Sequence, residues 1–395
     1  MGNKPRIGIV LAKTPGYSET FLVNKIEGLV TGGFEVTLFT DRKSNKPYRL
    51  CREYTAYTLP QNVFFRSIKV IAVLFLTFMR TPFRTVAYYH LERTERKTWN
   101  EFLKTTFRSS HMLGHTLDYL HFGFTTLAVG RENLGIVLKA KVSSSFRGYD
   151  IGIFPLKNPF VYNELWKKLD KAHTISKDLH HKALALGLPR SIPVVKIPPA
   201  IDVRKFLFPD RQPINNTELK ILTIGRLEWK KGLEVAIDAM TLLKTWNIKF
   251  KYTIVGAGSE MDRLLFNRHQ NKLAEQIQFV GVKRQDEIIS IMKEHDVYIQ
   301  PSLQEGFCNA VLEAQANGLL CIVSDAEGLS ENVLHNETGW VLPRGNPQIL
   351  ANKIREVMNL PFEVIQQMQD SAIGRVKRDF DLPHQRQQFI DFFSR

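Results

Sequence analysis

Residues 297–325 read VYIQPSLQEGFCNAVLEAQANGLLCIVSD. Two apolar, β-rich runs, VYIQPS (297–302) and LCIVSD (320–325), enclose a segment that is typical of a helix from about residue 310 to residue 317. A strand, a helix and a second strand of these lengths form a βαβ unit, in which both strands lie parallel in one sheet. The stretch therefore predicts an α/β fold built on a parallel sheet.

The same alternation continues upstream through the second half of the chain. Three more strand-like runs occur there, each followed by a helical pattern: LKILTIG (219–225), FKYTIVGAG (250–258) and IQFVGV (277–282). The helices are expected to begin near Gly232, Glu260 and Asp286. Strands that are apolar along their whole length and separated by helices indicate a sheet covered on both faces.

The first half repeats this organisation. RIGIVLA (6–12) and FEVTLFT (34–40) flank a helix for which we predict Ser18 as the N-cap and Gly32-Gly33 as the end. Further strands are expected at LDYLHFG (117–123), KVSSSF (141–146), HTIS (173–176) and VVKIPPA (194–200). The sequence thus predicts two Rossmann-like, doubly wound parallel-sheet domains, 1–207 and 208–379, with a C-terminal helix at about 380–395.

Length and composition fit this division. A chain of 395 residues with 44% hydrophobic and 24% charged residues is typical of a globular protein of two domains. The three cysteines, Cys51, Cys308 and Cys321, lack the spacing of a zinc site or a disulfide framework, which favours a reducing compartment. The N-terminal apolar run is too short for a signal peptide, and we expect a cytoplasmic protein.

Positive charge is concentrated in the first half. Residues 1–205 hold 32 Lys and Arg against 15 Asp and Glu, a net +17, whereas residues 206–395 hold 22 against 24. A basic half attracts anionic partners such as nucleic acid, anionic lipid or a phosphorylated acceptor, and a generally basic surface is the plainer interpretation. The aromatic-interleaved basic motifs of nucleic-acid-binding proteins are missing, so we expect no nucleic-acid partner.

An unusual apolar insertion, NVFFRSIKVIAVLFLTFMRTPFRTV (62–86), lies within this basic half. Its longest uncharged run, 70–79, is about half the length that a bilayer crossing needs. One interpretation is a segment that lies at the inner face of an anionic membrane, with its arginines and lysine at headgroup level. The other is a buried helix and loop that cover the first sheet.

Two charged side chains follow the strand at 219–225. In GRLEWKKG (225–232), Gly225 allows a sharp turn, and Arg226 and Lys231 are expected to project beyond the carboxyl end of the strand. A guanidinium and an ammonium there suit a diphosphate, although a basic surface turn is the commoner arrangement. The glycines of VGAG (255–258) lack the full G-x-G-x-x-G pattern and do not indicate a nicotinamide site.

The opening stretch contains two carboxylates eight residues apart. Glu305 precedes the helix and Glu313 lies one turn inside it, so both are expected to face the same crevice as ligands for the hexose and ribose hydroxyls of a nucleotide sugar. Gly306 makes the junction flexible, and we predict Asn309 as the helix cap with outward N–H groups at Phe307, Cys308 and Asn309. The alternative is two solvated glutamates.

These motifs together resemble a retaining glycosyltransferase of family 4 with the GT-B architecture, and more narrowly the bacterial exopolysaccharide and lipopolysaccharide glycosyltransferases of colanic-acid type. The resemblance covers nearly the whole chain except about 45–110. It rests in the second half on GRLEWKKG, YTIVGAG, QFVGV, EGFCNAVLEA, NGLLCIVSD and GLSENVLHNETGWVLP (328–343). In the first half it rests on residues 15–40, HFG (121–123), SFRGYD (145–150), SKDLHHKALALG and IPPAID (197–202).

The resemblance implies an acceptor-binding first domain and a donor-binding second domain that face a cleft, with the C-terminal helix crossing back to the first. By the same resemblance, Glu305 contacts the donor sugar and Glu313 the ribose, while Arg226 and Lys231 neutralise the diphosphate leaving group. The backbone at Gly16, after the first strand, resembles a contact to that diphosphate.

One departure concerns the acceptor side. Many relatives carry a His where this chain has Arg147, and Arg stays protonated and is no general base. Arg147 then stabilises the departing phosphate or binds an anionic acceptor, with His121 as the nearby alternative catalytic group and Asp150 as an orienting carboxylate. No metal or other cofactor is expected, and the D-x-D of Asp379-Phe380-Asp381 is interpreted as accidental.

The sequence therefore predicts a metal-independent hexosyltransferase that moves a sugar from a nucleoside diphosphate donor to a glycan or lipid-linked acceptor. The donor base, uridine or guanosine, stays open. The alternative is a nucleotide-sugar 2-epimerase, an isomerase that shares the two-domain architecture.

Overall fold

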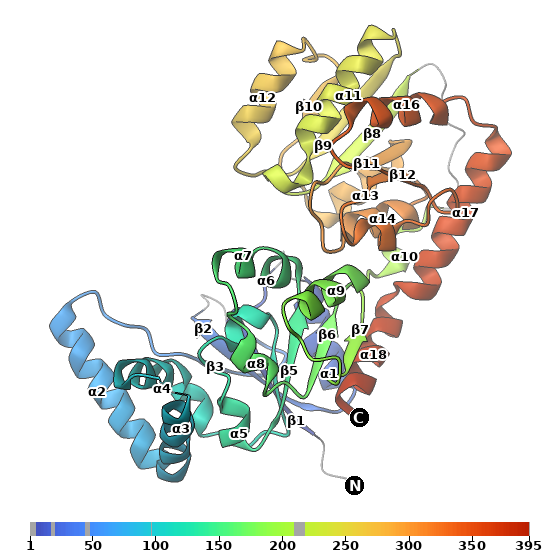
Figure 1. Ribbon diagram of the computed structural model, residues 1–395. Helices are drawn as coiled ribbons and strands as arrows, with labels where there is room; N and C mark the ends of the chain where they lie inside the picture. The colour runs from blue at the N-terminus through green and yellow to red at the C-terminus, as the bar shows by residue number, and fades with distance from the viewer. Residues whose placement is uncertain (1–4, 17–19, 44–47, 96, 209–217, 395) are drawn as a thin grey trace. The chain divides into compact units, whose positions relative to one another are not determined.

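The computed structural model describes residues 5–16, 20–43, 48–95, 97–208 and 218–394 (Figure 1). The chain divides into two compact units. Unit 1 comprises Met1–Ile197 and Arg386–Arg395, and unit 2 comprises Pro198–Gln385. Each unit is built on its own parallel sheet, as the alternation of strands and helices predicts.

Unit 1 contains a seven-stranded sheet in the order β3-β2-β1-β4-β5-β6-β7, with every neighbouring pair parallel. Its strands are β1 (Arg6–Lys13), β2 (Glu35–Arg42), β3 (Arg52–Thr55), β4 (Tyr119–Phe122), β5 (Lys141–Phe146), β6 (Lys171–Thr174) and β7 (Val194–Lys196). Six of these seven strands overlap the predicted runs. The short edge strand β3 was not predicted, because its sequence, REYT, lacks an apolar run.

The helices of unit 1 differ widely in length. The long ones are α1 (Thr20–Thr31), α2 (Val63–Arg80), α3 (Pro82–Thr94), α4 (Trp99–Leu113), α9 (Lys177–Ala185) and α18 (Leu382–Ser394), which starts in unit 2. Short turns of helix are η2 (Thr125–Ala128), α5 (Leu134–Leu138), α6 (Gly148–Gly152), α7 (Phe154–Lys157) and α8 (Asn163–Trp166). The predicted cap of α1, Ser18, lies outside the described residues.

The return of the C-terminal helix to unit 1 is confirmed by its packing. Phe389, Phe392 and Phe393 of α18 are buried in the same core as Ile7 and Ile26. Since these three rings come from the end of the chain, they close a core that otherwise consists of residues from the first half.

Unit 2 contains a six-stranded parallel sheet in the order β10-β9-β8-β11-β12-β13. The strands are β8 (Leu219–Ile224), β9 (Phe250–Val255), β10 (Ile277–Phe279), β11 (Val297–Gln300), β12 (Leu320–Ser324) and β13 (Trp340–Leu342). The helices are α10 (Val203–Phe206), η3 (Trp229–Lys231), α11 (Leu233–Thr245), α12 (Met261–Gln270), α13 (Gln285–Lys293), α14 (Asn309–Ala316), α15 (Leu329–Asn332), α16 (Pro347–Val357) and α17 (Phe362–Asp379).

Both sheets reverse their direction of growth at one point. In unit 2 the chain moves from β8 to β9 and β10 on one side, then returns to place β11 on the other side of β8. In unit 1 the same reversal separates β1 from β4. Ligands of open parallel sheets bind outside the carboxyl ends of the strands at such a reversal, so each unit has one favoured edge for a site.

The insertion at 62–86 forms α2 and the first part of α3. Helix α4 packs on β2 and β3, and α2 and α3 pack on α4, so the three helices form a group beside the edge of the sheet (Figure 1). Val73 and Thr77 of α2 are buried against this group. Across the described ranges, no helix combines the length and the hydropathy that a membrane crossing requires.

Candidate functional site

Lys231 and Glu305 form an ion pair beyond the carboxyl ends of β8 and β11. Lys231 ends η3, the turn after β8, and Glu305 lies in the loop after β11, so the pair spans the reversal point of the second sheet. Their side chains are only 12% and 13% exposed. Burial alone lowers the pKa of Lys231, but the Glu305 carboxylate outweighs it and the pKa is raised. The Lys231 ammonium is therefore charged at neutral pH.

Two more cations accompany this pair. Arg226 is exposed after Gly225, and Lys230 is half-buried next to Lys231. Burial, together with the positive charges of Arg226 and Lys231, lowers the pKa of Lys230 although the Glu305 carboxylate opposes the shift. The turn thus carries three cations in mutual electrostatic contact. Lys230 was not predicted from the sequence, although the two adjacent lysines of WKKG could have indicated it.

The loop that carries Glu305 is fixed by backbone hydrogen bonds. The Glu305 N–H donates to a carboxylate oxygen of Glu327 at 2.7 Å, and the Gly328 N–H donates to the Glu305 carbonyl at 2.9 Å. The main-chain carbonyl of Lys230 accepts from the N–H groups of Leu303 and Gln304, at 2.8 and 3.2 Å. These bonds tie the loop after β11 to the turn after β8, and they hold Glu305 beside Lys231.

The start of α14 differs from the prediction in two respects. The helix begins at Asn309 with Cys308 as its N-cap, so the predicted cap is wrong by one residue. The Cys308 N–H donates to Oδ1 of Asn332 at 3.0 Å, and Nδ2 of Asn332 donates back to the Cys308 carbonyl at 3.0 Å. The prediction that the Cys308 N–H faces outward is therefore wrong. Asn332 and Glu327 were missed because they lie about 20 residues downstream, near or within the segment GLSENVLHNETGW.

Gly306 and Phe307 are packed tightly within this loop. A Cβ at Gly328 would lie 1.9 Å from the Gly306 carbonyl oxygen, so only glycine permits the observed approach. The ring of Phe307 is buried and lies 5.6 Å from that of Phe380. We infer that Phe307 positions the loop through its side chain.

Glu313 lies half-buried on α14, and its charge acts on the hydroxyl of the buried Tyr298. That hydroxyl donates to the Ile224 carbonyl, at the end of β8, at 3.1 Å. Burial raises the pKa of the Glu313 carboxyl to about 7. A carboxyl whose pKa is strongly raised by burial, at the edge of a sheet where ligands bind, is typical of a functional residue.

This pKa predicts a pH-dependent stability. The carboxyl binds its proton more tightly in the folded chain than at its ordinary pKa of 4.5, so ionisation destabilises the fold as the pH rises from about 4.5 through 7. Glu313→Gln is expected to be more stable than the wild type at pH 8 and equally stable at pH 4.5, measured by urea unfolding. The exposed Glu363→Gln on α17 is the matched control. A Glu313→Gln difference that does not change with pH contradicts the assignment.

The glycines of VGAG serve the packing of two loops. A Cβ at Gly256 would lie 1.9 Å from the Gly225 carbonyl oxygen, and a Cβ at Gly258 would lie 2.2 Å from that of Leu227. The loop after β9 therefore lies directly against the turn that carries Arg226. Between the two open interpretations, a close ligand or an ordinary turn, the geometry favours the turn.

The D-x-D segment also has structural partners. Oδ1 of Asp381 accepts from the Val203 N–H at 3.3 Å and the Leu382 N–H at 3.0 Å, and Asp379 pairs with Arg378. Within the described part of the chain, no three His, Cys, Asp or Glu side chains come together as a metal site.

His121 is placed in the interior of unit 1 with no exposed surface. Its Nε2 lies 2.6 Å from Nζ of Lys25 and 3.0 Å from Oγ of Ser145, which contacts Nδ1 of His173 at 2.9 Å. Burial, reinforced by Lys25, holds the pKa of His121 well below its usual range. Because this imidazole is buried, neutral and hydrogen-bonded within the core, the geometry favours a structural role for His121 over contact with an acceptor.

Arg147 and Asp150 lie at the carboxyl end of β5. The guanidinium carbon of Arg147 is 3.8 Å from the centre of the Phe21 ring, a cation–π contact. Asp150 is buried and accepts from the Thr125 N–H at 2.8 Å, and burial raises the pKa of its carboxyl to about 7. Gly16 is exposed after β1, and a Cβ there would meet nothing within 4 Å.

Asp150 also lines a cavity of about 490 Å³ in unit 1. We call it the strand-end cavity, because its walls come from the carboxyl ends of β1 and β2 and the turns after β4 and β5. It lies at the reversal point between β1 and β4. Its charged lining residues are Lys13, Asp41, Arg42 and Asp150.

Comparison with known proteins covers both units. Residues 205–375 match the family model described as glycosyl transferases group 1. The amylovoran biosynthesis glycosyltransferase AmsK of Erwinia amylovora is 28% identical over 358 residues, which span 85% of this chain and 86% of that protein. The putative colanic acid biosynthesis glycosyltransferase WcaL of Escherichia coli K12 is 26% identical over 403 residues, 95% of this chain and 96% of that protein.

Solved structures share the fold across nearly the whole chain. Alr3699/HepE of Anabaena, solved in complex with UDP and glucose, superposes with a TM-score of 0.71 at 15% identity and 99% coverage of both chains. WaaG, a glycosyltransferase of lipopolysaccharide biosynthesis, gives a TM-score of 0.66 at 12% identity, with 98% and 99% of the two chains covered. The predicted GT-B fold is confirmed by these likenesses and by the two parallel sheets.

Proposed function

We propose that this chain, whose residues 205–375 form a glycosyl transferases group 1 domain within a GT-B fold, transfers a hexose from a nucleoside diphosphate sugar to a glycan or lipid-linked acceptor. The pathway is synthesis of a bacterial surface polysaccharide, as the names of its relatives suggest. The reaction retains the anomeric configuration and needs no metal ion. The 2-epimerase alternative is not favoured, since these relatives are named as glycosyltransferases.

The observation that carries this proposal is the Lys231–Glu305 pair at the reversal point between β8 and β11. A nucleotide sugar presents an anionic diphosphate beside a ring of hydroxyl groups. The cations of Arg226, Lys230 and Lys231 match the diphosphate, and the Glu305 carboxylate accepts hydrogen bonds from the sugar hydroxyls. Glu313, one turn into α14, binds the ribose hydroxyls.

The same arrangement explains how the rate is raised. When the bond from the anomeric carbon to the phosphate oxygen breaks, its electron pair stays on the diphosphate, whose negative charge increases. Fixed cations stabilise that charge more strongly in the transition state than in the bound donor. The backbone bonds that hold the Glu305 loop keep these groups in place before the donor arrives.

The acceptor is assigned to unit 1. The strand-end cavity offers the Asp150 carboxyl, whose pKa of about 7 suits hydrogen bonding to an acceptor hydroxyl in either protonation state. Arg147 lies near this carboxyl, since its charge lowers the Asp150 pKa against the larger effect of burial.

A panel of nucleotide sugars tests the proposal. One uridine or guanosine diphosphate sugar is expected to raise the melting temperature, and the rise should disappear in Glu305→Gln. With that donor, free nucleotide is released when an acceptor glycan is present, and the rate is unchanged by a chelator. Product without donor cleavage would support the isomerase, and no shift with any donor would oppose both.

We further propose that the chain contacts an anionic membrane through α2. The exposed side of α2 is apolar and without charge: Phe64, Ile68, Ile71, Phe75, Phe78 and Met79 are 44–69% exposed. At 100° per residue these six fall within an arc of about 100°. The segment 62–86 holds four cations and no acidic residue, which complements anionic headgroups.

Flotation with phosphatidylglycerol vesicles checks this contact. The triple variant Ile68→Ser, Ile71→Ser, Phe75→Ser is expected to lose most of its binding, because those side chains supply the apolar area that would enter the lipid. Phe266→Ser, which removes a 64% exposed ring from unit 2, is the matched control and should float like the wild type. Equal flotation of the triple variant would show that α2 is not the contact.

A further inference from the structure

A second and larger cavity lies beside the strand-end cavity in unit 1. Its volume is about 740 Å³, within the range of about 300–1,000 Å³ that is typical of small-molecule sites. We call it the α2–α4 groove, because those helices form one wall while the end of β2 and the segment after β3 form the other. The candidate site described above does not use it.

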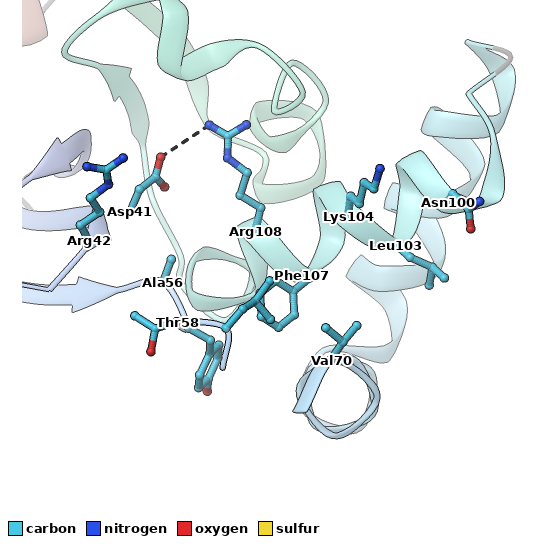
Figure 2. A pocket seen from close by; sticks show the side chains of 12 residues that line it. Asp41, Arg42, Ala56, Thr58, Val70, Asn100, Leu103, Lys104, Phe107 and Arg108 are labelled. Atoms are coloured by element: carbon cyan, nitrogen blue, oxygen red, sulfur yellow. Dashed lines mark ion pairs between the residues drawn. The ribbon is translucent and has the colours of Figure 1, made fainter. Parts of the chain in front are cut away.

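The groove has an apolar part and a charged part. Its apolar walls are Ala56, Tyr57, Leu59, Val70, Leu103 and Phe107. Figure 2 shows Val70, Leu103 and Phe107 toward one side of the groove, and Arg42, Asp41 and Arg108 together at the other. An occupant that matches this arrangement has a hydrocarbon portion and an anionic end.

The charged part is held in place by a buried ion pair. Asp41 pairs with Arg131, which has no exposed surface, and more weakly with Arg108 at 3.5 Å. Because Asp41 already faces two guanidinium groups, the exposed Arg42 and Lys104 keep the mouth of the groove positive overall. That charge suits a phosphate.

The groove and the strand-end cavity share one wall. Asp41 and Arg42, at the end of β2, line both spaces. On its other side the groove reaches α2 at Val70, while the opposite side of that helix carries the exposed apolar residues. A molecule whose hydrocarbon portion lies between α2 and α4 would therefore have its anionic end at the cations beside β2, at the wall that the groove shares with the strand-end cavity.

We infer that the α2–α4 groove binds the hydrocarbon chain of a lipid-linked acceptor. Its phosphate lies at Arg42 and Arg108, and its glycan occupies the strand-end cavity. This inference rests on the proposed function and specifies the acceptor class. A bilayer phospholipid fits the groove less well, because it has no glycan to fill the adjoining cavity.

Binding of farnesyl diphosphate tests the inference without any donor or turnover. The wild type is expected to bind farnesyl diphosphate at least tenfold more tightly than inorganic diphosphate in calorimetric titration, since the chain buries apolar surface. Leu103→Gln should lower the affinity for farnesyl diphosphate by about tenfold and leave the affinity for inorganic diphosphate unchanged. Equal affinity for the two ligands, or equal affinity of the two proteins, overturns the site.

Two further measurements distinguish the groove from the exposed side of α2 and from a site for membrane lipid. Ile71→Gln changes the exposed side of α2 and is expected to reduce flotation with vesicles while farnesyl diphosphate affinity stays at the wild-type value. Competition by dihexanoyl phosphatidylglycerol at the same concentration as farnesyl diphosphate would assign the groove to membrane lipid and overturn the inference. If no nucleotide sugar raises the melting temperature but farnesyl diphosphate still binds more tightly than inorganic diphosphate, the glycosyltransferase proposal is refuted while the groove remains a binding site.

Discussion

Glu305→Ala and Lys231→Ala are each expected to lower the turnover of glycosyl transfer by about 10²- to 10³-fold, the usual cost of removing one preorganised charge from a transition state. In the proposed function, Lys231 stabilises the leaving diphosphate and Glu305 orients the donor sugar. The two side chains also form an ion pair with each other. Turnover is measured with the donor that the thermal-shift panel selects.

Variants with side chains of similar shape distinguish a loss of catalysis from a loss of folding. Glu305→Gln and Lys231→Met retain most of the side-chain volume, so melting temperatures within a few degrees of the wild type would show that lost activity is catalytic. The double variant should be little worse than either single one, because the two groups act as a unit. Activity within threefold of the wild type in either single variant would remove the pair from the mechanism.

Asp41→Asn is expected to destabilise the protein by about 3–5 kcal/mol, because it leaves the Arg131 guanidinium buried without its counter-charge. The loss is measured by urea unfolding at pH 7. The matched control is Glu164→Gln, which breaks an ion pair whose side chains are 66% and 40% exposed and should cost less than about 1 kcal/mol.

A second substitution distinguishes the buried charge from lost packing. Asp41→Asn combined with Arg131→Met removes both charges, and it should recover most of the lost stability because no unpaired charge remains. A double variant as unstable as the single one would show that the pair is not the source of the effect. The same double variant should also lower affinity for farnesyl diphosphate, since Asp41 orients Arg108 at the mouth of the groove.

The sequence predicted the parallel sheets well because buried strands are apolar along their length. It also placed Arg226, Lys231 and Glu305 at strand ends, and parallel neighbours bring such ends to one edge, so a pair 74 residues apart in the chain was accessible to reasoning. The residues that hold the Glu305 loop could not be predicted from the sequence. Glu327 and Asn332 act through individual side-chain-to-backbone hydrogen bonds, one from Glu327 and two from Asn332, which leave no periodic pattern in the sequence.

The first half was predicted less completely, for two physical reasons. The α2–α4 group packs on an edge strand, so its helices alternate buried and exposed apolar residues, and the sequence pattern alone left a buried helix and an interfacial one equally open. His121 was proposed as a candidate because it ends a strand, but its neighbours in the fold, Lys25, Ser145 and His173, come from three separate segments.

The three phenylalanines of α18 impose an order on biosynthesis. Residues up to Ile197 leave the ribosome long before Phe389, Phe392 and Phe393, which complete their core. At about 5–20 residues per second, the nascent first half waits roughly 10–40 s with that apolar surface uncovered. Chaperone capture during translation would fall within this interval, and a premature stop codon before residue 389 would damage the half of the chain that is translated first.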